Sequence, residues 1–100
     1  MVRENAWTGC DKKKINKVME FCEGYRQFIS SCKTERECAA RSIELAKEHG
    51  YNDLNEIIKK GGTLKAGDKV YACNMGKALV LFNVGREPLE NGMKILGAHI

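Results

Sequence analysis

The sequence predicts an α/β fold in which two N-terminal helices pack on the first strands of a mixed sheet. In the first half of the chain, apolar residues recur at intervals of three and four, as they do along one face of a helix. The second half instead has short apolar segments separated by glycine-containing turns. One of these segments, Ala78–Phe82, is continuously apolar, which is typical of a strand buried on both faces in a layered α/β protein.

The first helix is expected over residues 11–31, where the apolar positions follow the helical period. A second helix is expected to begin at Thr34, because Thr34 and Glu37 have the spacing of a capping box. Gly50 suits the left-handed position that follows a helix, and residues 53–58 could add a short third helix. The inner face of the second helix is lined by Ala39, Ile43 and Ala46.

The strands are expected in the second half of the chain. Residues 69–74 alternate weakly and are followed by Met75-Gly76, which predicts a tight connection into Ala78–Phe82. A loop is expected from Gly85 to Gly92, and Met93–Ile100 reads as a third strand. A terminal carboxylate on such a buried-type strand would be costly. We therefore expect the 100 residues to be the front part of a longer polypeptide, the alternative being a complete small domain whose last strand lies at a sheet edge.

Composition limits the partners of the chain. With 100 residues, 43% hydrophobic, the chain fits one small core and one domain. The basic cluster Lys12–Lys14 is diluted by Asp11, Glu20 and Glu23, so we expect no nucleic-acid site. The longest apolar stretch is too short to span a bilayer, which predicts no membrane partner. A polar start with no apolar signal segment predicts a cytoplasmic protein.

His99 is the candidate site residue. Imidazole is the commonest neutral metal ligand, and His99 would stand at the carboxyl end of an apolar strand, where sites collect in open α/β sheets. The alternative is a histidine that is simply hydrogen-bonded near the core. His49 precedes Gly50 at a helix end and is expected to interact with the last carbonyls of that helix. The five cysteines lack zinc or redox spacing and are expected to be reduced structural thiols.

A series of short motifs runs along the chain in a fixed order, and in this order they resemble the N-terminal portion of the aspartyl aminopeptidase family. This family consists of dinuclear-zinc exopeptidases and includes vacuolar aminopeptidase I. The motifs are Ala6-Trp7, Tyr25–Phe28, Lys33–Glu37, Gly67–Tyr71, Gly76-Lys77, Val84-Gly85, Pro88-Leu89, Gly92 and Gly97–Ile100.

The resemblance implies that residues 1–100 are the N-terminal part of a larger α/β/α zinc-exopeptidase catalytic domain that continues beyond residue 100. It implies that His99 ligates one of two zinc ions, that peptides are the substrates and that the protein forms homo-oligomers, dodecamers in the family. The other ligands and the glutamate general base lie downstream in the family. Since catalytic zinc needs about three protein ligands, the 100 residues alone are expected to be inactive. The alternative function is a complete small α+β binding module without enzymatic activity.

Overall fold

The computed structural model describes residues 2–100, which divide between Cys32 and Lys33 into two compact units. The first unit contains the helix α1, Lys12–Ser31. Its N-terminus is capped by Asp11, whose carboxylate accepts a hydrogen bond of 2.7 Å from the backbone N–H of Lys14. The helix predicted over residues 11–31 is therefore confirmed.

The second unit begins with the helix α2, Glu35–Glu48. The predicted capping box is present: the Thr34 hydroxyl accepts from the backbone N–H of Glu37 at 3.2 Å, and the Glu37 carboxylate accepts from the backbone N–H of Thr34 at 2.9 Å. At the other end, Gly50 adopts the left-handed conformation with φ of 84°, as predicted. The backbone N–H of Tyr51 then donates to the carbonyl of Ala46 at 3.0 Å, which closes the helix.

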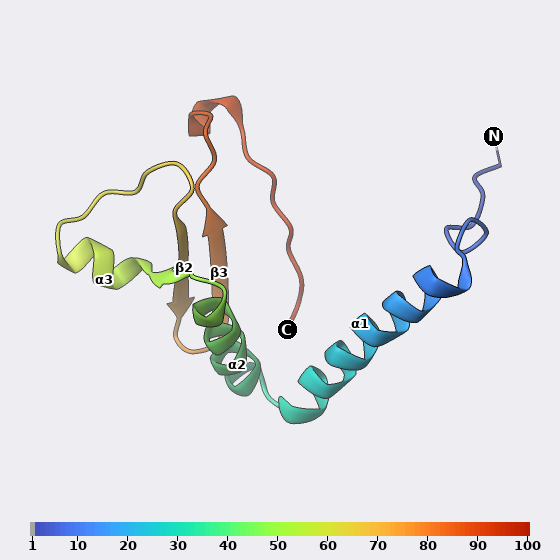
Figure 1. Cartoon of the computed structure of the whole chain (residues 1–100). Coiled ribbons are helices and arrows are strands. Elements are labelled where there is room, and N and C mark those ends of the chain that lie inside the picture. The colour runs from blue at the N-terminus through green and yellow to red at the C-terminus, as the bar shows by residue number, and fades with distance from the viewer. Residues whose placement is uncertain (1) are drawn as a thin grey trace. The chain divides into compact units, whose positions relative to one another are not determined.

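A three-stranded mixed sheet follows, in the order β1-β2-β3. Figure 1 shows its two longer strands, β2 and β3, side by side. Strand β1, Asn52–Asp53, pairs in parallel with β2, Lys69–Asn74. The short helix α3, Leu54–Lys59, lies in the connection between these two strands. Strand β2 pairs in an antiparallel manner with β3, Ala78–Asn83. The mixed α/β fold class is thus confirmed, with α2 contacting both β2 and β3.

The turn between β2 and β3 is the tight connection predicted from Met75-Gly76. Both residues have positive φ, 53° for Met75 and 68° for Gly76, which is the backbone conformation found at the central positions of primed hairpin turns. Three residues, Met75–Lys77, separate the paired residues Asn74 and Ala78. The backbone N–H of Lys77 donates to the carbonyl of Asn74 across this turn at 3.0 Å.

The buried apolar residues of this unit are Ala39, Ala46, Val70 and Tyr71.

Two predictions about the strands are wrong. Strand β3 is not buried on both faces: Val80 and Leu81, which point to opposite faces of the sheet, are 62% and 48% exposed. Met93–Ile100 is not a strand: after the 3-10 helix Leu89–Asn91 it runs without regular structure. A segment becomes a strand only when a neighbour accepts its backbone hydrogen bonds, and within residues 2–100 none does.

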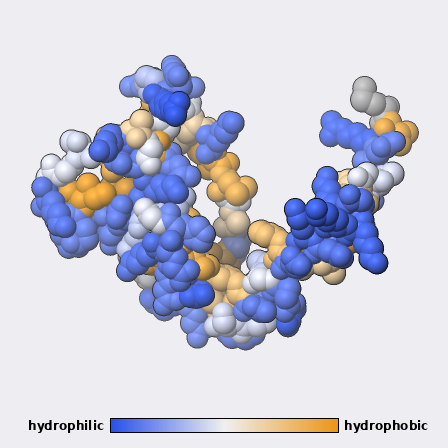
Figure 2. All heavy atoms as spheres, in the orientation of Figure 1, coloured by the Kyte–Doolittle hydropathy of each residue, from blue (hydrophilic) through white to orange (hydrophobic). Residues whose placement is uncertain are grey.

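The C-terminal segment exposes apolar side chains, because it does not pair with the sheet as a strand. Ile95 and Leu96 are 82% and 98% exposed, and Figure 2 shows apolar side chains along this C-terminal segment. The third strand of the sheet is instead β1, whose two polar residues carry no apolar alternation that sequence analysis could detect. No helix among residues 2–100 has the length and apolar character needed to cross a membrane.

Candidate functional site

His99, the predicted metal ligand, is exposed in the irregular C-terminal segment, and no hydrogen bond or ion pair engages its imidazole within residues 2–100. The same residues bring together no group of three His, Cys, Asp or Glu side chains that could hold a metal ion. Because a catalytic zinc ion needs about three protein ligands, the described residues do not make a zinc site by themselves.

His49 has the structural role predicted for it. Its Nδ1 atom lies 2.8 Å from the carbonyl oxygen of Leu45 in the last turn of α2. The Lys69 ammonium donates to the carbonyl of His49 at 3.4 Å and lies over the ring of Tyr51, 5.7 Å from its centre. These contacts tie the C-terminal end of α2 to the start of β2.

The segment Lys33–Glu37 joins the other end of α2 to the β2–β3 turn. The Arg36 guanidinium donates a hydrogen bond of 3.0 Å to the carbonyl of Met75, which is 39 positions away in sequence. Gly76 lies so close that a Cβ atom there would be 3.3 Å from Nη1 of Arg36. A second link is the ion pair between Lys77 and Glu35, with 3.6 Å between Nζ and Oε1. We call these two links, Arg36–Met75 and Glu35–Lys77, the α2 clasp.

Hydrogen bonds shift the acidity of both glutamates in this segment. The pKa of Glu37 lies below its ordinary value, because its carboxylate accepts from the backbone N–H groups of Lys33 and Thr34. The pKa of Glu35 is also lowered, first by a hydrogen bond to its own backbone N–H and then by the positive charge of Lys77. The capping role of Thr34 and Glu37 is visible in the sequence pattern, whereas the clasp is not, because its partners are far apart along the chain.

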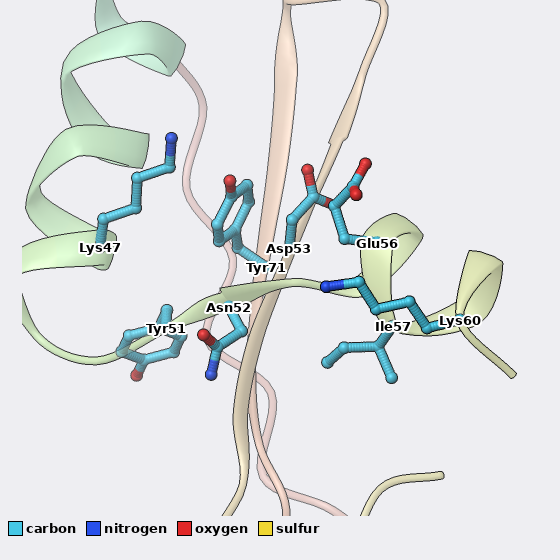
Figure 3. Close-up of a pocket in the computed structure, with 8 residues that line it drawn as sticks. All are labelled: Lys47, Tyr51, Asn52, Asp53, Glu56, Ile57, Lys60 and Tyr71. Carbon is cyan, nitrogen blue, oxygen red and sulfur yellow. The ribbon is translucent and has the colours of Figure 1, made fainter. Parts of the chain in front are cut away.

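A hollow opens between the end of α2, strand β1, helix α3 and strand β2 (Figure 3). We call it the Tyr71 hollow, because Tyr71, with only 6% of its surface exposed, forms its wall. The sequence pattern does not reveal this hollow, because its side chains come from four different elements. Its lining residues are Lys47, Tyr51, Asn52, Asp53, Glu56, Ile57, Lys60 and Tyr71.

Comparison with known proteins decides the family. A family model described as aminopeptidase I zinc metalloprotease (M18) matches residues 28–100. The chain belongs to the M18 peptidase family. The match includes the clasp segment Lys33–Glu37 and His99, whereas the Ala6-Trp7 motif lies outside it. The resemblance found from the sequence motifs is thereby confirmed.

Individual M18 proteins are similar over nearly the whole chain. The probable M18 family aminopeptidase 1 of Clostridium acetobutylicum is 50% identical over 97 residues, which cover 97% of this chain and 21% of that protein. The protein of the same name from Borreliella afzelii is 35% identical over 99 residues, 99% of this chain and 21% of the relative. The crystal structure of aminopeptidase I from Borrelia burgdorferi B31 matches with a TM-score of 0.78 and 34% identity, over 90% of this chain and 21% of that one. The chain thus spans about a fifth of the length of these M18 proteins.

Proposed function

We propose that this chain is the N-terminal part of a zinc-dependent aminopeptidase, which removes the N-terminal residue from peptides. The observation that carries the proposal is the M18 match over residues 28–100, together with relatives named as aminopeptidases at up to 50% identity. The alternative of a binding module without enzymatic activity is not favoured by this match. The cytoplasm as location, homo-oligomeric assembly and two zinc ions per catalytic site belong to the same proposal.

Within this proposal, His99 is a metal ligand. Its imidazole is exposed and makes no hydrogen bond within residues 2–100, so its nitrogens are available. The remaining ligands and the general base would have to come from residues outside the 100 described by this sequence. The 100-residue chain is therefore expected to bind no catalytic zinc and to be inactive by itself.

Exchange of segments with a relative tests the proposal. In the Clostridium protein, the stretch of 97 matching residues is replaced by this chain, and hydrolysis of aminoacyl amides is measured with zinc or manganese present. We expect the chimera to be active and the purified 100-residue chain to be inactive. An inactive but correctly folded chimera, or hydrolysis by the 100-residue chain free of contaminating peptidases, would contradict the proposal.

A further inference from the structure

We propose that the Tyr71 hollow is a binding site for a zwitterionic α-amino acid. This inference goes beyond the aminopeptidase function, and none of its residues belongs to the metal centre proposed above. All eight lining residues lie within the second compact unit, so the hollow does not depend on how the two units are placed.

The hydroxyl group of Tyr71 is the first observation that indicates a ligand. Tyr71 is 94% buried on strand β2, yet its hydroxyl has no hydrogen-bond partner among residues 2–100. The hydroxyl of a largely buried tyrosine normally has a hydrogen-bond partner, which here has to come from water or a ligand in the hollow. No side-chain atom that is completely buried lacks a partner in the described residues, so this hydroxyl must reach open space. In Figure 3 it points toward the region between Lys47 and Asp53.

The charges around this hydroxyl are arranged in two opposite groups. In the view of Figure 3, the Lys47 ammonium lies on one side of Tyr71, and the carboxylates of Asp53 and Glu56 lie on the other. Lys47 forms no ion pair within residues 2–100. Asp53 uses Oδ1 to accept from the backbone N–H of Asn55 at 2.8 Å, which leaves its second oxygen available. Glu56 is paired with Lys59 at 3.2 Å, on the exposed side of α3.

This arrangement selects the ligand class. The carboxylates of Asp53 and Glu56 would repel a phosphate group. The ammonium groups of Lys47 and Lys60 would repel a metal cation. A zwitterion satisfies both groups when its carboxylate faces Lys47 and the Tyr71 hydroxyl and its ammonium faces Asp53. Free amino acids are also what the proposed aminopeptidase would release, but binding here does not require that activity.

The test is a titration of the 15N-labelled 100-residue chain, followed by backbone amide chemical shifts. The probes are L-leucine, L-leucinamide, which lacks the carboxylate, and N-acetyl-L-leucine, which lacks the ammonium. The variants are Tyr71→Phe, which keeps the buried ring, and Lys47→Met, which keeps the apolar stem. Lys65→Met, an exposed lysine outside the hollow, is the matched control. The amide spectrum of each variant also reports whether it is folded.

We expect leucine to cause saturable shifts at Asp53, Ile57 and Tyr71. Loss of either ligand charge, of the Tyr71 hydroxyl or of the Lys47 ammonium should weaken binding about tenfold, as removal of one hydrogen bond to a charged group does. Lys65→Met should bind as the unsubstituted chain does. Absence of saturable shifts, equal binding of the three probes, or unchanged affinity in folded Tyr71→Phe would overturn the proposal. Because no hydrolysis is measured, failure here leaves the aminopeptidase proposal untouched.

Discussion

Replacement of Arg36 by methionine tests the α2 clasp. Methionine keeps a long apolar side chain and the helix propensity of arginine but removes the guanidinium that donates to the carbonyl of Met75 at 3.0 Å. A hydrogen bond from a charged donor contributes about 1.5–3 kcal/mol, and an ordinary one about 0.5–1.5 kcal/mol. Arg36 is exposed, and water can replace it at the Met75 carbonyl, so we expect a loss of about 1 kcal/mol.

For a domain of this size, 1 kcal/mol lowers Tm by about 4–8 °C. The assay is thermal unfolding followed by circular dichroism, with the Met75 and Gly76 amide shifts as a local readout. Arg86→Met is the matched control, because Arg86 is exposed and its side chain has no partner within residues 2–100; we expect its Tm to stay within about 1 °C of the unsubstituted chain. Equal Tm values for the two variants, with unmoved turn amides, would refute the clasp.

Three further predictions concern the same unit. Thr34→Ala removes the N-cap of α2 and should cost about 1 kcal/mol in urea unfolding, whereas Thr34→Ser should restore most of it; equal midpoints would contradict the cap. Gly76→Ala places a side chain at φ of 68° and near Nη1 of Arg36, so its cost of about 1–2 kcal/mol should exceed that of Gly85→Ala, where a Cβ atom meets nothing within 4 Å. The lowered pKa of Glu37 means that the unfolded chain binds more protons than the native one. The stability it contributes is therefore present above its ordinary pKa of 4.5 and is lost as pH falls through the native value. As pH falls below 4.5, the urea midpoint of Glu37→Gln should therefore decrease less than the midpoint of the unsubstituted chain. An equal decrease in both proteins would contradict the lowered pKa of Glu37.

Local chemistry explains why the helices could be predicted from the sequence. The capping box joins Thr34 to Glu37, three positions apart, and the left-handed Gly50 follows directly from the end of α2. Each of these features needs only a few neighbouring residues, so the sequence pattern contains all the information required. The same holds for Met75-Gly76, whose two positive φ values make the turn between β2 and β3.

Features that depend on distant neighbours could not be predicted in this way. The apolar run Ala78–Phe82 forms a strand, but its burial depends on what packs over its two faces and along its second edge. Strand β2 lies along one edge of β3, and no strand of the described residues lies along the other. Met93–Ile100 is also rich in apolar residues and is irregular, because no strand of the described residues pairs with it. The partner of Arg36 is 39 positions away, and the Tyr71 hollow combines four elements. His99 as a zinc ligand was inferred from the family resemblance, because the spacing of residues within this chain supplies no second ligand.

Zinc content tests the central claim most directly. The chimera with the Clostridium protein is purified in three forms, unsubstituted, His99→Ala and His49→Ala, and bound zinc per subunit is measured together with aminoacyl amide hydrolysis. We predict that His99→Ala loses bound zinc and most activity, while His49→Ala, which alters only the contact with Leu45 at the end of α2, keeps both. Full zinc content and full activity in His99→Ala would contradict the role of His99 as a metal ligand.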